Sequence, residues 1–451
     1  MKIRIEGVLD HRQQKQHLPF AFTMPPGATR LNIQFDYSPK VSTGQDYRND
    51  LSLTLFDPQR ARGARHNNQD RNLTITAQTA TPGYIPGELL PGVWTVWIDT
   101  HRVLPPDTIA YAFDIDISTE PLAEPDHHYA KVTPAPRGRG WYRGDLHGHT
   151  LHSDGSWDVP NLVQYARDYH LDFVTLSDHN TTSGLAQLDS LAGDDLLTIG
   201  GMELTTYYGH ALALGVREWV EWRVGVNDAT MPDLAQRVMD SGGTFIIAHP
   251  MSEGDPFCTG CDWAYAEMMP GNARCVEVWN SEWDSGRQNE ESLQLWYHWL
   301  NQGYRIVATR GSDIHRPIDY DNVGFNVVYA EELSESAILD GIRRGHNYIS
   351  AHPRLDFTAQ AQDGSIGMMG DLVSGEATRA RIAWEGCDGS ERLRIIVNGE
   401  ISEELSVSEH GQHEWALASS ARWCVVEIRR ADGEMVALTN PIFLGDVTNW
   451  R

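Results

Sequence analysis

The sequence has few cysteines, few basic residues and no long apolar run, and each shortage argues against a class of protein. Its 451 residues contain five cysteines, too few for a fold held together by disulfides. Lys and Arg total 36 against 62 Asp and Glu, and the net charge of −26 disfavours an electrostatic grip on nucleic acid or an anionic membrane. No run of about 18 or more apolar residues occurs, so no membrane-spanning helix is expected. We therefore expect neither a nucleic-acid nor a membrane partner.

The first residues also lack the apolar stretch of a secretory signal. Met1–Glu6 alternates between apolar and polar residues, as a strand does. This pattern leads us to expect a cytoplasmic protein.

The cysteines include one C-x-x-C pair, Cys258 and Cys261, with Cys275 further along. A zinc knuckle normally needs four ligands, and no second pair is present. Reduced structural thiols are the favoured interpretation, and a further metal site or a redox pair is the alternative.

The chain is long enough for several domains, and its pattern changes twice. Residues 1–136 and 351–451 alternate between apolar and polar positions with turn residues between the runs, which predicts an N-terminal β-sandwich and a small C-terminal β domain. A Pro- and Gly-rich stretch, Pro134–Gly140, is the predicted linker. In residues 141–350, short β-rich runs alternate with helical ones, which predicts a parallel sheet or a barrel.

Within residues 141–350, we expect strands over 172–176, 244–248, 276–279 and 305–308, and helices that begin near Val159, Met231, Glu290 and Glu335. Residues of metal-ligand type follow these strands repeatedly. They are His147 and His149, Asp154, His179, Glu203, His210, His249, and finally Asp313 and His315. Imidazoles and carboxylates hold Zn, Mn or Fe in hydrolytic sites. Two imidazoles one residue apart on a strand point the same way, so His147 and His149 can reach one ion.

These motifs resemble the PHP (polymerase and histidinol phosphatase) family of metal-dependent hydrolases. The segments that carry the resemblance are 145–150 with 153–155, 178–179, 248–250 and 311–315. The flanking β domains and the closing segment 439–443 are similar to the carbaryl-hydrolase-like branch of that family.

The resemblance implies a distorted (β/α)7 barrel with two or three divalent ions at the C-terminal edge of its strands. It implies a first ion held by His147, His149, Glu203 and Asp313. Glu203 would bridge to a second ion held by His210 and His249, and Asp154, His179 and His315 would hold a third. For His210, placed only by its distance from Glu203, an ordinary loop histidine is the alternative.

Further residues are candidates for catalytic or substrate-binding roles. We expect Asp178 to orient a ligand, and Asn280 to contact substrate or a water molecule at the metal site. Arg143, Arg310 and Arg316 flank ligand segments and could clamp an anionic oxygen, although an ion pair or a solvated surface is an equal alternative. Trp141, Trp279 and Trp283 fit the core better than a substrate platform.

The leading hypothesis is an enzyme, a metal-dependent phosphoesterase that cleaves a small, anionic phosphate mono- or diester. A carboxyl- or carbamate-ester hydrolase and a non-catalytic binding protein are the alternatives. Arginines near the metals would favour phosphate, whereas an apolar, Trp-lined pocket would favour an aryl ester. The sequence leaves the oligomeric state open.

Overall fold

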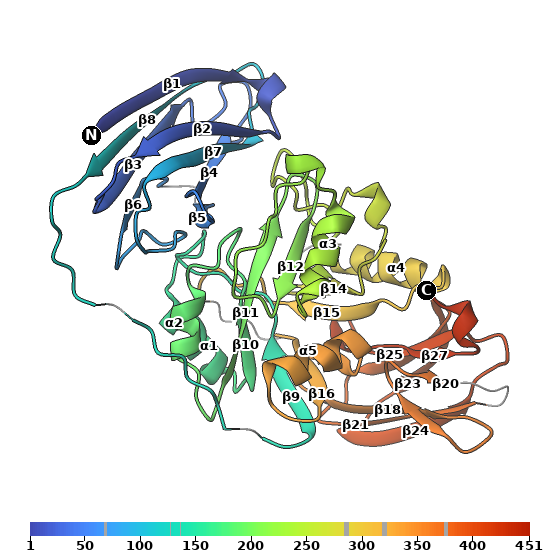
Figure 1. The fold of residues 1–451 in the computed structure, drawn as a ribbon. Helices are drawn as coiled ribbons and strands as arrows, with labels where there is room; N and C mark the ends of the chain where they lie inside the picture. Colours follow the sequence, from blue (N-terminus) through green and yellow to red (C-terminus); the bar gives the residue numbers. More distant parts are fainter. Residues whose placement is uncertain (67–69, 127, 136, 284–287, 318–322, 374–377) are drawn as a thin grey trace.

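The computed structural model describes residues 1–66, 70–126, 128–135, 137–283, 288–317, 323–373 and 378–451. Over these residues the chain is multidomain and mostly sheet, with few helices. In Figure 1 the N-terminal strands (blue) and the C-terminal strands (orange to red) lie at opposite ends of a central unit.

The N-terminal part is a β-sandwich of two four-stranded antiparallel sheets, ordered β1-β8-β3-β6 and β2-β7-β4-β5. Alternate residues of facing strands, such as Ile33 and Phe35 on one sheet and Val96 and Ile98 on the other, fill one apolar core. The strands are β1 (Lys2–Asp10), β2 (His17–Met24), β3 (Arg30–Ser38), β4 (Asp50–Phe56), β5 (Ala61–Arg65), β6 (Leu73–Thr76), β7 (Gly92–Arg102) and β8 (Thr108–Ser118).

The central unit is built on a curved, mixed sheet in the order β15-β14-β13-β12-β11-β10-β9-β16-β17. Its strands are β9 (Gly140–Asp145), β10 (Phe173–Leu176), β11 (Leu197–Thr205), β12 (His210–Leu214), β13 (Thr244–Ile247), β14 (Cys275–Asn280), β15 (Val307–Gly311), β16 (Phe325–Ala330) and β17 (Asn347–Ser350). A regular (β/α)7 barrel is not shown. β12 runs antiparallel to both neighbours, β16 runs antiparallel to β9, and the ladder between the described parts of β15 and β16 does not close.

Asparagine side chains complete the edge of β15 instead of a ladder. Asn326 of β16 accepts from the Arg310 amide at 3.0 Å and donates to the Arg310 carbonyl at 2.7 Å. Asn440, which follows β26 (Met435–Thr439), accepts from the Ala308 amide at 2.7 Å and donates to the Ala308 carbonyl at 2.9 Å. Asn347 of β17 also donates to the Ala308 carbonyl, at 3.1 Å. The backbone of β15 is thus hydrogen-bonded on both sides without a neighbouring strand on one of them.

Five helices are described: α1 (Val159–Asp168), α2 (Leu185–Ser190), α3 (Met231–Asp240), α4 (Gln288–Asn301) and α5 (Glu335–Arg344). The predicted starts of α1, α3 and α5 are confirmed. At each start a side chain caps the first turn, from Asp158, Thr230 and Ser334 respectively. The short α2 was not predicted. Of the helices that the structure describes, none is both long enough and apolar enough to cross a membrane.

The C-terminal part has a four-stranded sheet, β19-β18-β21-β24, packed on strands that continue the central sheet, β26-β25-β22-β23. Because β17 pairs with β26, the expected boundary near Ser350 does not separate two sheets. The strands are β18 (Arg354–Gln360), β19 (Ile366–Met368), β20 (Leu372–Val373), β21 (Arg379–Glu385), β22 (Arg392–Val397), β23 (Glu400–Ser406), β24 (His410–Ala416), β25 (Trp423–Arg429), β26 (Met435–Thr439) and β27 (Ile442–Leu444).

Candidate metal centre

The residues of metal-ligand type come together at one edge of the central sheet. Most of them follow a strand or stand at its end: β9, β10, β11, β12, β13 and β15 contribute. They form three overlapping groups whose ligand atoms lie within 4.8 Å of one another. The groups are His147, His149, Glu203 and Asp313; His179, Glu203 and His210; and His149, Asp154, His179 and His315.

The first group has the geometry of a tetrahedral metal site. The Nε2 atoms of His147 and His149 lie 3.2 and 3.3 Å from Glu203 Oε2, and 3.4 and 3.0 Å from Asp313 Oδ1. Four ligands at zinc bond lengths of about 2.0–2.1 Å from one ion would be separated by about 3.3 Å. The residues therefore fit a divalent ion without rearrangement.

The hydrogen bonding of these atoms supports the same fit. The Nε2 atoms of His147 and His149, Glu203 Oε2 and His210 Nδ1 are buried and make no hydrogen bond of acceptable geometry. Buried polar atoms without a partner are costly in a native protein. An ion in the first group and a second ion beside His210 would together satisfy all four atoms.

Glu203 lies at the middle of the cluster and is fully buried. While Oε2 faces the first group, Oε1 lies 3.0 Å from His210 Nδ1 and 3.2 Å from His249 Nε2. This is the arrangement that the bridging role predicts for the second ion. It also places His210 beside the cluster, where the sequence left an ordinary loop histidine as the alternative.

The third group lies at the rim of the centre. Asp154 Oδ1 is 3.4 Å from His179 Nε2 and 3.2 Å from His315 Nε2. His149 stacks between the two rings, with centroids at 4.3 and 4.2 Å. Two contacts go beyond those the resemblance implies, since His149 approaches this group and His179 Nδ1 also lies 2.9 Å from Glu203 Oε2.

Burial and charge set the protonation of the cluster. Burial alone would raise the pKa of Glu203, but the surrounding imidazoles outweigh it and hold that pKa well below its usual range. Burial, together with His315 and His179, lowers the pKa of His149 to about 4. Burial also disfavours the charged form of His147, His179, His249 and His315, but neighbouring carboxylates outweigh it and raise the pKa of these four imidazoles. Because a metal ion binds the neutral imidazole, binding would displace protons from them.

Glu277 is a functional candidate that the sequence reasoning missed. It lies on β14 and is 1% exposed. Its Oε1 is 2.9 Å from His147 Nδ1, and its Oε2 accepts from the His249 amide at 3.1 Å. Gly311 makes room for it, because a Cβ there would lie 2.1 Å from Glu277 Oε1. The one available signal was a lone carboxylate inside the apolar run Cys275–Trp279.

Replacing Glu277 with glutamine should weaken metal binding. A carboxylate that accepts the Nδ1–H of His147 leaves Nε2 free to bind an ion, and loss of such support typically costs about 10–100-fold in affinity. Competition with a chelating indicator measures this. Glu391→Gln is the matched control, because Glu391 is fully buried beside His352 in the C-terminal part. Equal metal affinity in Glu277→Gln and the wild type would contradict the role.

Asp178 and Asn280 support the centre through other groups. Asp178 accepts from the Thr150 amide and hydroxyl, both at 2.7 Å, and from the Ser153 hydroxyl at 2.6 Å, so it orients the turn before Asp154. Its predicted partner was a ligand imidazole. Asn280 donates to Glu277 Oε2 at 3.1 Å.

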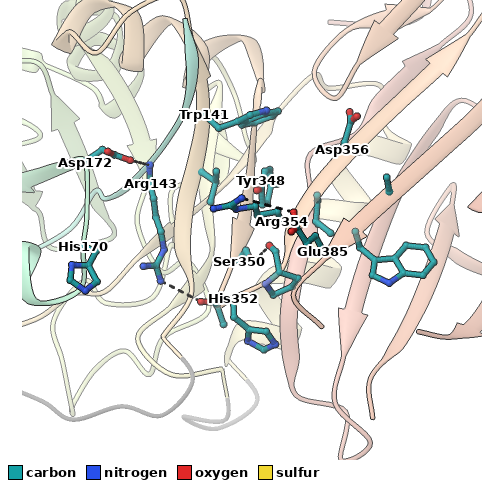
Figure 2. Close-up of a pocket in the computed structure, with 16 residues that line it drawn as sticks. Trp141, Arg143, His170, Asp172, Tyr348, Ser350, His352, Arg354, Asp356 and Glu385 are labelled. Carbon is teal, nitrogen blue, oxygen red and sulfur yellow. Dashed lines mark hydrogen bonds and ion pairs between the residues drawn. The ribbon is translucent and has the colours of Figure 1, made fainter. Parts of the chain in front are cut away.

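The three arginines end in different places. Arg143 lies on β9 and donates to the carbonyls of Tyr169 and Ala351, at 2.9 and 3.3 Å. Figure 2 shows it in a separate cavity of about 820 Å³ between the central and C-terminal parts. Arg310 is fully buried, with one nitrogen 3.6 Å from Asp145 Oδ1. Neither reaches the metal cluster, so the prediction that these two arginines could clamp an anion there is wrong. Of the three arginines, only Arg316 remains a candidate for that role.

Arg316 is exposed and lines a cavity of about 410 Å³ with Asp154, Ser156, Asp313 and His315. This cavity opens on the third group. The tryptophans lie elsewhere: Trp279 and Trp283 are buried in the central core, and Trp141 lines the cavity of Figure 2.

The N-terminal sandwich reaches the edge of the centre. The His66 ring lies 4.9 Å from that of His179, and its buried Nδ1 has no partner. Two further contacts join the sandwich to the loop after β10, because Thr181 donates to the Gly83 carbonyl at 2.7 Å and Ser183 accepts from the Gly83 amide at 3.0 Å. No feature of the sequence predicted this contact.

Cys258 and Cys261 are joined in a disulfide, whereas Cys275, Cys387 and Cys424 are free and buried. The favoured interpretation of reduced thiols therefore fails for the pair and holds for Cys275. Cys275 lies in β14 and is not part of the disulfide.

Comparison with models of known protein families finds no match, and neither does a search of curated proteins. Among solved structures, two neighbours are predicted or proposed metal-dependent phosphoesterases and one is an amidohydrolase. A two-domain protein from Bacteroides vulgatus that contains a predicted PHP-like metal-dependent phosphoesterase shares 15% identity at a TM-score of 0.39, covering 71% of this chain and 100% of that one.

Two further neighbours match a smaller part of the chain. A proposed metal-dependent phosphoesterase from Bifidobacterium adolescentis shares 17% identity at a TM-score of 0.29, over 38% of this chain and 87% of that one. An amidohydrolase from Chromobacterium violaceum, with bound sulfate and no metal, shares 15% identity at a TM-score of 0.29, over 39% and 88%. At these identities and TM-scores, the neighbours alone assign no activity to this chain.

Proposed function

We propose that this chain is a metal-dependent phosphoesterase acting on a small phosphate mono- or diester. The observation that carries the proposal is the convergence of His147, His149, Glu203 and Asp313 at the separations of a tetrahedral site. Two or three divalent ions, zinc, manganese or iron, would be held by nine residues, the eight of the three groups and His249. Such ions, when bound, lower the pKa of water and stabilise the negative charge that develops on oxygen during hydrolysis.

The protein's own residues would prepare the site in three ways. Glu203 would offset the repulsion between cations, since its two oxygens face different imidazole sets. Glu277 would keep the His147 lone pair directed at the ion, and Asp178 would hold the turn that presents Asp154. Burial of the inner ligands would exclude bulk water on that side.

The rim would receive the substrate. Side-chain exposure is 32% for His315, 22% for Asp154 and 23% for Asp313, against 0% for His147, His149 and Glu203. The adjoining cavity of about 410 Å³ suits a small molecule. Arg316 supplies a cation there, and no Phe, Tyr or Trp is among the described residues that line the cavity. This lining supports an anionic ester over a neutral aryl carbamate.

Membership of the PHP family, in its carbaryl-hydrolase-like branch with a distorted (β/α)7 barrel, belongs to the same proposal. So does a division into domains at 1–136, 141–350 and 351–451. The four motifs and the positions of their side chains at one sheet edge support the family assignment. The separate apolar cores of the N- and C-terminal parts support the division into domains.

The substrate class is tested with a panel of nitrophenyl phosphates, phosphodiesters and naphthyl carbamates on the metal-loaded protein. We expect higher kcat/KM for the phosphate esters, with competitive inhibition by inorganic phosphate, because the cations and Arg316 favour an anion. Arg316→Met should lower kcat/KM for phosphate esters by about tenfold or more, the worth of a hydrogen bond to a charged group.

Arg237→Met, which removes an exposed arginine from α3, is the control and should leave kcat/KM unchanged. Faster hydrolysis of naphthyl carbamates without inhibition by phosphate would instead support the carbamate-ester hydrolase. No turnover on any ester, with metal bound, would support a binding protein.

A further inference from the structure

A loop between β13 and the following 3-10 helix covers two ligand candidates of the metal centre. Its ends are held together by a β-bridge between Met251 and Asp262. Inside it, the disulfide between Cys258 and Cys261 closes a small ring that contains Thr259 and Gly260. Both cysteines are only partly buried, so the bond borders solvent.

Two carbonyls of this ring bind the imidazoles of His210 and His249. His210 Nε2 lies 3.2 Å from the Thr259 carbonyl, and His249 Nδ1 lies 3.1 Å from the Cys261 carbonyl. The opposite nitrogens, His210 Nδ1 and His249 Nε2, face Glu203 Oε1 at 3.0 and 3.2 Å. A neutral imidazole has one N–H, so donation to each carbonyl leaves the other nitrogen with its lone pair toward Glu203.

The ring packs tightly against His210 and against the backbone that follows β11. Gly260 has a φ of +76°, and a Cβ there would lie 2.0 Å from the Thr206 carbonyl and 3.3 Å from His210 Cδ2. The loop is also attached to the N-terminal sandwich, since Lys15 pairs with Asp255 at 2.7 Å and Arg102 donates to the Pro256 carbonyl at 2.9 Å. These contacts hold the segment before Cys258, and the disulfide ties that segment to Cys261, whose carbonyl binds His249.

We propose that the Cys258–Cys261 disulfide is a redox modification site that positions His210 and His249, and that its reduction weakens the ion held by these two histidines. This inference rests on the proposed metal centre. Reduction by a phosphine breaks the sulfur–sulfur bond. The disulfide takes up two electrons and two protons to give two thiols, while the phosphine gains an oxygen from water and becomes a phosphine oxide. Without the ring, the two carbonyls lose their fixed spacing and the two imidazoles lose their fixed orientation.

The test compares oxidised and phosphine-reduced full-length protein at buffered free zinc. Thiol titration of the unfolded chain verifies the state: five cysteines with one disulfide give three thiols, and the reduced chain gives five. We expect one ion per chain to bind about 10–100-fold more weakly after reduction, the range for loss of groups that orient a ligand. The ion at His147, His149 and Asp313 should keep its affinity, so it serves as the internal reference.

Two variants separate the disulfide from general effects of the reductant. The double variant Cys258→Ser, Cys261→Ser should bind zinc like the reduced wild type and show no response to phosphine. Cys387→Ser, which alters a buried free cysteine in the C-terminal part, should keep the full response. If the double variant fails to fold, the comparison of the two wild-type states still decides the result.

Equal zinc affinity in the oxidised and reduced wild type would overturn this proposal and leave the metal centre intact. Five thiols in protein isolated without reductant would overturn it as well. No zinc binding in either state would overturn the metal centre and, with it, this inference.

Discussion

Replacing Glu203 with glutamine should strip the protein of metal and reduce turnover more than any other single substitution. The side chain is fully buried and lies within 3.3 Å of five imidazoles, those of His147, His149, His179, His210 and His249. Glutamine keeps the shape and removes the negative charge, so the repulsion between neighbouring cations is no longer offset. The loss should exceed the roughly 10–100-fold typical of a residue that only supports a ligand.

Elemental analysis of the purified variant, with kinetics on a nitrophenyl phosphate, measures the effect. The N- and C-terminal sheets have separate apolar cores and should remain folded in Glu203→Gln. Glu391→Gln is again the matched control and should retain both metal and turnover. Full metal content in Glu203→Gln would mean that another carboxylate bridges the ions.

Removing the metal from the wild type should abolish turnover and lower the thermal stability of the central unit. An ion that binds only the folded state stabilises it by about 2.7 kcal/mol when its free concentration is 100 times Kd. For a unit of 150–250 residues, about 1 kcal/mol shifts Tm by roughly 2–4 °C. Dialysis against a chelator should therefore lower Tm by several degrees.

Adding zinc, manganese or iron back to separate samples should restore Tm and turnover, and the metal that restores both at the lowest concentration is the best candidate for the native one. In Glu203→Gln, the same additions should raise Tm much less. Unchanged turnover after exhaustive chelation would rule out a metal-dependent reaction.

The sequence predicted well what depends on local spacing. His147 and His149 alternate along an extended segment after β9, so their side chains share a direction, and the structure brings them to the same pair of carboxylates. The predicted starts of α1, α3 and α5 were likewise correct, and in the structure a capping side chain precedes each of them.

What depends on tertiary contacts could not be predicted in the same way. Glu277 was missed because its partner, His147, is 130 positions away. The antiparallel course of β12 depends on a return over only a few residues after Thr205, which the apolar pattern does not encode. Arg143 is close to the ligands along the chain, yet its guanidinium is held away from them by the carbonyls of Tyr169 and Ala351.

Backbone conformation at the ligands was also beyond the sequence. His249 has a φ of +27° and Asp313 a φ of +54°, a region that few residues with a side chain adopt. The surrounding contacts must hold these conformations, since a side chain adds a steric cost there.

The bonds from Asn440 to Ala308 bear on how the molecule is made. The two residues are 132 positions apart, so during synthesis the outer edge of β15 emerges from the ribosome long before the side chain that protects it. Until then the Ala308 amide on that edge lacks its partner, whereas Asn326 and Asn347 can already bind the Arg310 groups and the Ala308 carbonyl. An unpaired amide on a strand edge can bind an extended segment of another chain, which invites association. The C-terminal part thus completes the hydrogen bonding of the central sheet late in synthesis. A fragment that ends near Ser350 would lack the Asn440 side chain altogether.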